Sequence, residues 1–134
     1  MNRAIAGVER PAVAERSVHR PRRMTESQFV AWCDEDTRAE WVNGEVILMS
    51  PVNWEHGDLV QFLTAVFRTF VEEGDLGRTQ GLEYQVRFAD IPSRRVPDLL
   101  FVSKDRMDLA GPDHFEGAPD LVVEIVSPDS TARD

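Results

Sequence analysis

The sequence VPDLLFV at residues 96–102 places one carboxylate, Asp98, in an apolar, β-branched run that is typical of a buried strand. A second run of this kind, LVVEIV at residues 121–126, carries Glu124. An ionised carboxylate in such surroundings costs free energy unless a hydrogen-bond partner, an opposite charge or a metal ion compensates it. Because facing side chains on neighbouring strands come within roughly 5 Å, the two carboxylates are expected to bind one cation together.

The expected cation is Mg²⁺ or Mn²⁺, since the neighbourhood offers oxygen ligands but no second cysteine and no close pair of histidines. Period-two alternation puts Asp120, Val122, Glu124 and Val126 on one face of the second run. Glu124 is then the deep carboxylate of that face, whereas Asp120 at the strand start is expected to be solvated. Bound ions of this type usually act on phosphate groups.

Composition narrows the class of protein. A chain of 134 residues with 42% hydrophobic content fits one domain with a real core. The net charge of -9 argues against a protein that coats nucleic acid through bulk electrostatics, but not against a nuclease whose acidic residues hold metal. The single cysteine, Cys33, excludes an internal disulfide and favours a cytoplasmic protein. No apolar stretch approaches the roughly 20 residues that span a bilayer, and the Arg-rich start lacks a signal core, so membrane and export functions are not expected.

The chain divides into a tail and a domain. Residues 1–23 carry six arginines among alanines and prolines without periodicity, which predicts a disordered or loosely packed tail. Two interpretations remain for this tail: an arm that touches phosphate, or a solvated leader without function, and the second is favoured. Residues 24–134 are expected to form the folded domain.

Local signals predict the elements of that domain. Thr25 and Gln28 form a capping box that starts a short helix ending near Cys33. The dipeptide Asn43-Gly44 predicts a hairpin between strands at 39–42 and 45–49. Apolar residues at helical spacing predict a core helix that ends at Gly74. Further strands are expected at 82–88, 96–102 and around Glu124, with a turn at 91–93 and an irregular loop over 104–119.

The order of several motifs resembles a known pattern. Pro97-Asp98 followed by an apolar strand with Glu124 resembles the PD-(D/E)XK nuclease superfamily. Three further stretches are similar to the Uma2 family of restriction-endonuclease-like proteins, over about residues 25–134: EWVNGE at 40–45, MSP at 49–51 followed by His56, and VEIVSPDST at 123–131.

The resemblance implies an α/β fold of the restriction-endonuclease-like type, in which helices flank a central mixed sheet. It also implies Mg²⁺-assisted hydrolysis of phosphodiester bonds in DNA, with the metal held by Asp98, Glu124 and the backbone carbonyl of Ile125. Glu40 matches an acidic residue that would add an outer-shell ligand, and His56 matches a histidine that would bind phosphate or position water. The alternative interpretation for Glu40 is a solvated hairpin carboxylate, and for His56 a polar residue at the start of a helix.

One departure from the pattern concerns the lysine of D/E-X-K, because Val126 occupies its position. The resemblance places the family's lysine downstream, on a helix after the Ser-Pro motif, and with the last residue at Asp134 the domain is expected to be incomplete at its C-terminus. Lys104 is expected to lie too far away, since six extended residues span about 20 Å. An arginine would supply charge but would not handle a proton, and the candidates are Arg94, Arg95 and Arg133.

Two functions therefore stay open from the sequence. The first is a metal-dependent DNA endonuclease, and the alternative is a non-catalytic binding module that keeps the nuclease fold and acts through protein contacts. The last strand is expected to have an unpaired edge and an uncovered apolar face, so a homodimer is also expected.

Overall fold

The computed structural model describes residues 23–126. Residues 1–22 of the predicted tail at 1–23, and the arginine candidate Arg133, lie outside this range. Arg23 belongs to the folded part, where its guanidinium donates to the carbonyl of Asn43 at 3.1 Å. The elements in chain order are α1 (Glu26–Trp32), β1 (Ala39–Val42), β2 (Glu45–Leu48), α2 (Trp54–Glu73), β3 (Gly77–Gln80), β4 (Gln85–Phe88), β5 (Ser93–Arg95), β6 (Leu99–Ser103), a 3₁₀ helix (Lys104–Leu109), β7 (His114–Glu116) and β8 (Leu121–Val123).

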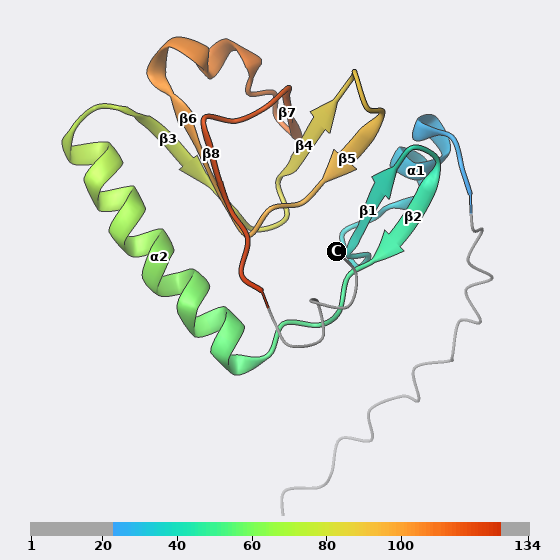
Figure 1. Ribbon diagram of the computed structural model, residues 1–134, viewed down its shortest axis with the longest axis horizontal. Helices are drawn as coiled ribbons and strands as arrows, with labels where there is room; N and C mark the ends of the chain where they lie inside the picture. The colour runs from blue at the N-terminus through green and yellow to red at the C-terminus, as the bar shows by residue number, and fades with distance from the viewer. Residues whose placement is uncertain (1–22, 127–134) are drawn as a thin grey trace, which may run out of the picture.

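The strands form two sheets that stand side by side, with α2 along the outer flank of one and α1 against the other (Figure 1). The five-stranded sheet has the order β2-β1-β5-β4-β7, and the three-stranded sheet has the order β3-β6-β8. The larger sheet is mixed, because β4 and β7 run parallel while its other pairs are antiparallel. The predicted α/β class with a mixed sheet and flanking helices is confirmed, and its strands are divided between two sheets.

The N-terminal third of the domain follows its local sequence signals. The Thr25 hydroxyl accepts from the amide of Gln28, and the Gln28 side chain accepts from the amide of Thr25, so the capping box is confirmed. The hairpin turn has positive φ at Asn43 (46°) and Gly44 (92°), as its sequence predicts. The helix α1 and the hairpin pack together and form the first core, a cluster of Met24, Phe29, Ala39, Trp41 and Val46.

A second core lies between the two sheets. Its buried side chains come from β4, β6 and β7, and are Val86, Leu100, Val102 and Phe115. Phe115 lies in a segment that was expected to be an irregular loop, and that expectation is wrong. The segment contains a 3₁₀ helix and the strand β7, which pairs with β4 in parallel. Three-residue strands are too short to show a periodic pattern, which explains why the sequence did not reveal β7.

Three further segments differ from expectation. β3 was not predicted, since its sequence GRTQ has no apolar alternation. The strand expected at 82–88 begins only at Gln85, because Leu82 and Glu83 form a turn with φ values of 53° and 69°. The turn expected at 91–93 ends earlier, so that Ser93 begins β5.

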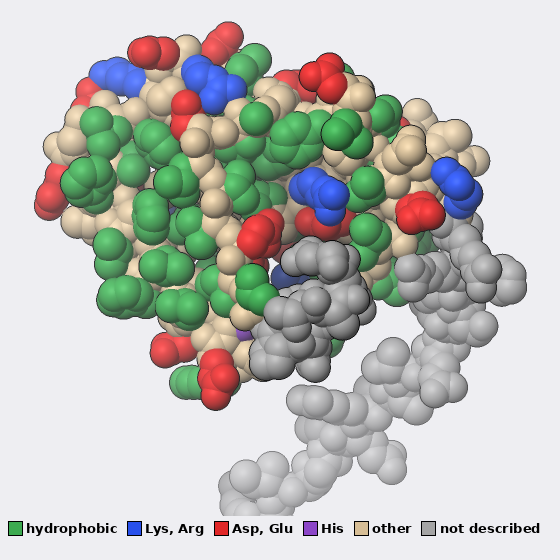
Figure 2. Space-filling view, in the orientation of Figure 1, with side chains coloured by type: hydrophobic (Ala, Val, Ile, Leu, Met, Phe, Trp, Pro, Cys, Tyr) green, Lys and Arg blue, Asp and Glu red, His purple; other side chains and the backbone are tan. Residues whose placement is uncertain are grey.

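The helix α2 is less buried than a core helix should be. It begins after Asn53, whose side chain accepts from the amide of His56, and it ends at Gly74 as predicted. Val71 is its buried residue, while a stripe of four large apolar side chains is exposed: Leu59, Phe62, Val66 and Phe70. Figure 2 shows hydrophobic side chains gathered over this side of the molecule. Despite the stripe, no helix within residues 23–126 is long and apolar enough to cross a membrane.

An ion-pair network ties α1 to the larger sheet and leads to a stability prediction. Glu26 Oε1 accepts from Arg87 Nε at 2.6 Å and from Arg94 Nε at 2.9 Å. These hydrogen bonds lower the pKa of Glu26 below its ordinary value, and the bond from Arg87 has the larger effect. Because Glu26→Gln leaves two partly buried guanidinium groups with a weaker partner, we expect it to lower the free energy of unfolding by about 1–3 kcal/mol in urea titrations.

The matched control is Glu72→Gln, which breaks the exposed Arg68–Glu72 pair within α2 and should cost less than about 0.5 kcal/mol. The stabilisation by Glu26 is present above the ordinary carboxyl pKa of 4.5 and is lost as pH falls through the lowered pKa of the folded state. The wild type and Glu26→Gln should therefore converge in acid. Equal stability of the two variants at neutral pH would show that the network contributes nothing.

Candidate metal centre

The two carboxylates identified first lie at the same end of the smaller sheet. β6 and β8 pair antiparallel with Leu99 opposite Val123, so the next residues along each strand, Asp98 and Glu124, follow the last pair. The apolar runs predicted that both residues lie inside strands. In the structure both lie just beyond the strand ends, so this expectation is wrong. Pro97 explains this for Asp98, because proline has no amide to continue the ladder of hydrogen bonds.

Asp98 is fixed by contacts from two directions. Its Oδ1 lies 3.0 Å from His56 Nε2, and its Oδ2 accepts from the amide of Ile125 at 2.8 Å. The side chain is only 12% exposed. His56 reaches Asp98 from the first turn of α2, whose start is set by the Asn53 cap. The carboxylate is therefore held between the main helix and the backbone beside Glu124.

Glu40 joins the site from β1. Its Oε1 accepts from the amide of Val96 at 2.9 Å, and its Oε2 lies 3.2 Å from Arg95 Nη1. Its side chain is 15% exposed, so the carboxylate is not the solvated hairpin group of the alternative interpretation. These contacts connect the first hairpin to the segment that leads into Asp98.

Glu124 has an unusual protonation equilibrium. Partial burial of its carboxyl group raises the pKa to about 7, and the negative charges of Asp98 and Glu40 add to this, together with a hydrogen bond from protonated Glu124 to Asp98. Arg95 acts in the opposite direction. The residue as a whole remains exposed, so the desolvation is confined to the carboxyl group that faces Asp98. Three carboxylates thus crowd into one region.

The structure brings together all four side chains singled out in the sequence, Glu40, His56, Asp98 and Glu124, although they come from four separate segments. The backbone of Ile125 is beside them, through its hydrogen bond to Asp98. The donor set expected from the sequence suits a hard divalent cation, since its ligands are carboxylate and carbonyl oxygens and a cation would relieve the repulsion between Asp98 and Glu124. Within residues 23–126, no group of three or more His, Cys, Asp or Glu side chains is arranged to hold a metal ion, so the expected set needs the carbonyl of Ile125.

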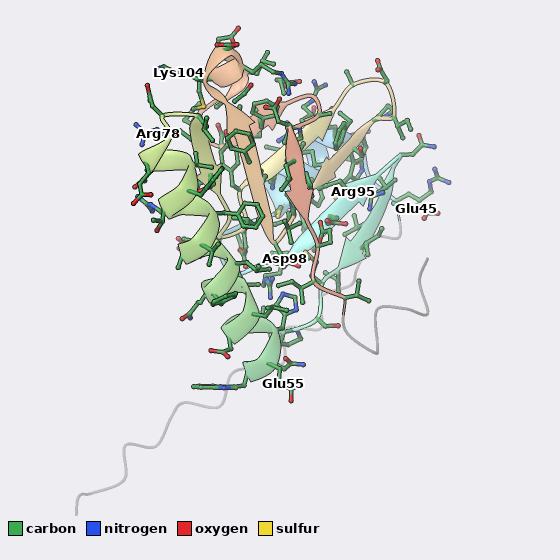
Figure 3. The ribbon with its side chains drawn as sticks, turned by 60° about the vertical axis from the view of Figure 1, so that its left-hand side comes forward. Glu45, Glu55, Arg78, Arg95, Asp98 and Lys104 are labelled. Carbon is green, nitrogen blue, oxygen red and sulfur yellow. The ribbon has the colours of Figure 1, made fainter. Side chains whose placement is uncertain are left out.

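The structure places Lys104, Arg94 and Arg95, the described candidates for the role of the lysine, in different surroundings. Lys104 lies beyond the far end of β6 and pairs with Asp75, so its expected distance from the site is confirmed (Figure 3). Arg94 is bound to Glu26 and Gln85. Arg95 is the candidate that contacts the carboxylate cluster, through Glu40. Sequence alone did not single out Arg95, because the two arginines are adjacent and only the strand's alternation separates them.

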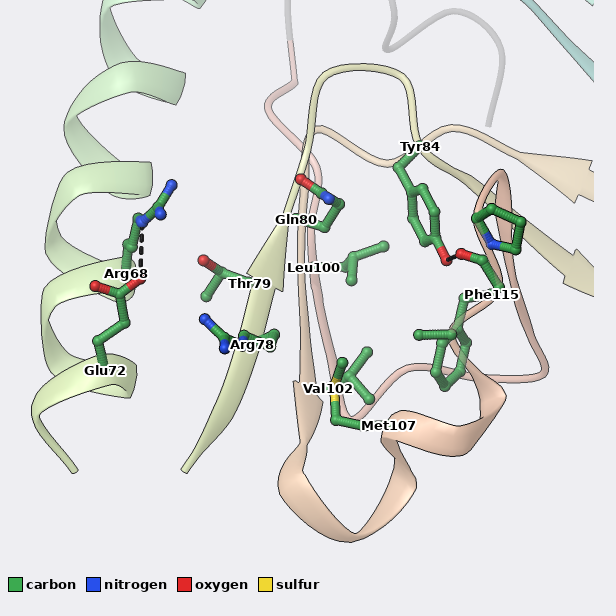
Figure 4. A pocket seen from close by; sticks show the side chains of 13 residues that line it. Arg68, Glu72, Arg78, Thr79, Gln80, Tyr84, Leu100, Val102, Met107 and Phe115 are labelled. Carbon is green, nitrogen blue, oxygen red and sulfur yellow. Dashed lines mark hydrogen bonds and ion pairs between the residues drawn. The ribbon is translucent and has the colours of Figure 1, made fainter. Parts of the chain in front are cut away.

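A surface hollow of about 360 Å³ lies apart from these residues (Figure 4). Leu100, Met107 and Phe115 are among the apolar residues of its lining, and Arg78 and Tyr84 are among the polar ones. The Tyr84 hydroxyl donates to the carbonyl of Gly111 across it. None of the four candidate site residues lines this hollow.

The chain is similar to one protein family and to a protein of known structure. The Uma2 family, described as "Putative restriction endonuclease", matches residues 26–134. The crystal structure of a protein described as a putative nuclease from Anabaena variabilis ATCC 29413 is similar with a TM-score of 0.68 and 23% sequence identity. The match covers 79% of this chain and 60% of that protein, so the chain spans about three fifths of its length. None of the curated proteins matches this chain.

Proposed function

Since the chain belongs to the Uma2 family of restriction-endonuclease-like proteins, we propose that it is a divalent-metal-dependent endonuclease that hydrolyses phosphodiester bonds in DNA. The observation that supports this best is the meeting of Asp98 and Glu124 at one end of the smaller sheet, with the backbone of Ile125 against Asp98. The free thiol of Cys33 fits a reducing, cytoplasmic setting.

The proposed metal ligands are the carboxylates of Asp98 and Glu124 and the carbonyl of Ile125, and the ion is Mg²⁺ or Mn²⁺. When bound, such an ion polarises a phosphoryl group and lowers the pKa of water. The chain's own part is to hold the two carboxylates close together in spite of their repulsion. The amide of Ile125 and the ring of His56 do this by fixing both oxygens of Asp98.

Glu40 and His56 act as positioning residues in this proposal. His56 Nε2 lies on Asp98 Oδ1, so it orients the carboxylate that faces the metal. Glu40 fixes the amide of Val96, two residues before Asp98, and adds negative charge to the cluster. Partners of this kind typically change metal affinity or activity by about 10–100-fold when they are removed.

The second candidate function is a binding module that retains the nuclease fold without catalysis. The observation that favours it is Val126, an exposed apolar residue at the position where the D/E-X-K pattern has lysine. Lys104 pairs with Asp75, so within residues 23–126 no ammonium group is placed to stabilise the charge that develops on phosphate.

A plasmid-nicking assay combined with calorimetric metal titration tests the two candidates. The nuclease proposal expects Mn²⁺ and Mg²⁺ to bind and to support nicking that EDTA stops. Metal binding without nicking of any DNA form would support the binding module. Absence of both metal binding and nicking would overturn the proposed metal centre.

We further propose that the chain forms a homodimer through the exposed stripe of α2. Phe62 and Phe70 are 63% and 70% exposed, and burial of such large apolar surfaces favours association. The prediction is a concentration-dependent increase in sedimentation coefficient, which Phe62→Glu weakens because a charge would be buried in the interface. The matched control Gln61→Glu adds the same charge at the neighbouring position and should leave association unchanged. A monomer at all concentrations would exclude the homodimer.

A further inference from the structure

Position 126 is the starting point, because an exposed valine stands where the nuclease pattern has a cation. Lys104, the chain's one lysine, pairs with Asp75 beyond the far end of β6 and is not available to the site. If phosphate is bound at the carboxylate cluster, a positive charge beside the cluster would offset the repulsion from three carboxylates, and residues 23–126 can be searched for one.

Two adjacent arginines of β5 lie on opposite faces of the strand. Arg94 donates to Glu26 and Gln85, and only 13% of its side chain is exposed. Arg95 points to the other face of the strand, as alternation requires, and there it meets Glu40. The pairing of β1 with β5 explains the contact, since Trp41 is opposite Arg94, and one step further in this antiparallel register brings Glu40 towards Arg95.

Arg95 retains most of its hydrogen-bonding capacity. A guanidinium group has five N–H donors, and within residues 23–126 that of Arg95 uses Nη1, on Glu40 Oε2. Glu40 is itself held by the amide of Val96, so this contact anchors the arginine without enclosing it. With 46% of its side chain exposed, Arg95 can reach a second acceptor in the solvent beside the cluster.

The geometry points to Arg95 as a phosphate-binding cation of this site, anchored on Glu40 and open to solvent beside the carboxylates. The inference rests on the proposed function, and it names the ligand chemistry as a phosphodiester of nucleic acid. A guanidinium group matches two phosphate oxygens with two parallel N–H donors, which a carboxylate-rich site otherwise lacks. The influence of Arg95 on Glu124 is consistent with its closeness to the cluster.

This role differs from that of a lysine in one measurable way. A guanidinium group stays protonated at all working pH values, so Arg95 supplies charge but transfers no proton. Removal of Arg95 should therefore weaken binding and slow cleavage while no titrating group is lost from the pH profile of cleavage. A residue that handled a proton would change that profile.

The test is fluorescence anisotropy with a short labelled DNA duplex in the presence of Ca²⁺, at several salt concentrations, together with cleavage in Mn²⁺. Arg95→Gln should weaken duplex binding about tenfold and reduce the slope of log affinity against log salt by about one unit. Arg95→Lys should restore the slope. The matched control is Arg78→Gln, which removes an exposed arginine of β3 far from Asp98 and should leave cleavage unchanged (Figure 3).

Unfolding is separated from lost binding by a second comparison. The double variant Glu40→Gln/Arg95→Gln leaves no unpaired charge, and it should bind the duplex as weakly as Arg95→Gln. If the wild type binds and cleaves DNA while Arg95→Gln matches Arg78→Gln in duplex affinity, salt slope and cleavage, the role of Arg95 is overturned and the nuclease proposal stands. If the wild type binds neither metal nor duplex, both proposals fail.

Discussion

Asp98→Asn and Glu124→Gln should each weaken Mn²⁺ binding by at least about 10²-fold, and DNA cleavage should fall by a similar factor or more. Each substitution keeps the shape of the side chain and removes one negative oxygen ligand. The remaining carboxylate cannot neutralise a divalent cation alone, and an amide oxygen is a weaker ligand for a hard ion. Calorimetric titration with Mn²⁺ measures the first effect, and plasmid nicking measures the second.

A matched control separates the site from general charge effects. Glu55→Gln makes the same change from carboxylate to amide near the start of α2, one residue before His56, at an exposed position. It lowers the overall negative charge equally but should leave metal binding unchanged. If Glu55→Gln weakened binding as much as Asp98→Asn, the ion would be responding to overall charge rather than to the predicted centre.

The metal-free forms offer an independent check on folding. Glu124→Gln removes one of the carboxylates that crowd Asp98, so without metal it should be at least as stable as the wild type. Asp98→Asn alters the acceptors for His56 and Ile125 and should be less stable. Lost metal binding in a protein of undiminished stability would locate the effect at the site. Lost stability in Glu124→Gln would contradict the crowding of carboxylates.

The sequence predicts the parts of this fold that depend on neighbouring residues. The capping box at Thr25 and the Asn43-Gly44 turn are local, because their partners lie within a few positions and their φ values follow from residue type. The strand β3 and the short strand β7 depend on partners far along the chain, so no local pattern predicts them. Leu82 was mistaken for a strand residue because a left-handed turn has no apolar signature.

The candidate site shows the same division. Asp98 and Glu124 were recognisable as carboxylates in apolar runs, and their adjacency followed once β6 and β8 proved to be neighbours. That His56 contacts Asp98 depends on the direction of α2, which composition does not encode. The choice between Arg94 and Arg95 depends on which of them lies on the same face of the sheet as Glu40, and this is fixed only by the register of β1 and β5.

The pH dependence of metal binding should be unusually steep near neutrality. Glu124 must lose its proton to become a ligand, and its pKa is raised to about 7 from the ordinary 4.5. Above pH 7 the Mn²⁺ affinity should be constant, and below it the affinity should fall by about tenfold per pH unit, which gives roughly 10²-fold by pH 5. Glu124→Gln should bind weakly with no such slope.

Without metal, Glu124 should make the stability of the folded protein decrease as pH rises, which is opposite to the trend in metal affinity. The folded state holds the proton of Glu124 more tightly than the unfolded state, so its contribution to stability is fully present below pH 4.5 and is lost as pH rises to about 7. Metal affinity should therefore increase across the pH range in which the stability contribution of Glu124 decreases, and Glu124→Gln should remove both trends together. A wild-type metal affinity that is already constant between pH 5 and 7 would mean that the Glu124 carboxyl titrates as an ordinary solvated acid. In that case neither the partial burial of the carboxyl group nor the repulsion from Asp98 and Glu40 raises its pKa, and the crowding of carboxylates at this site is contradicted.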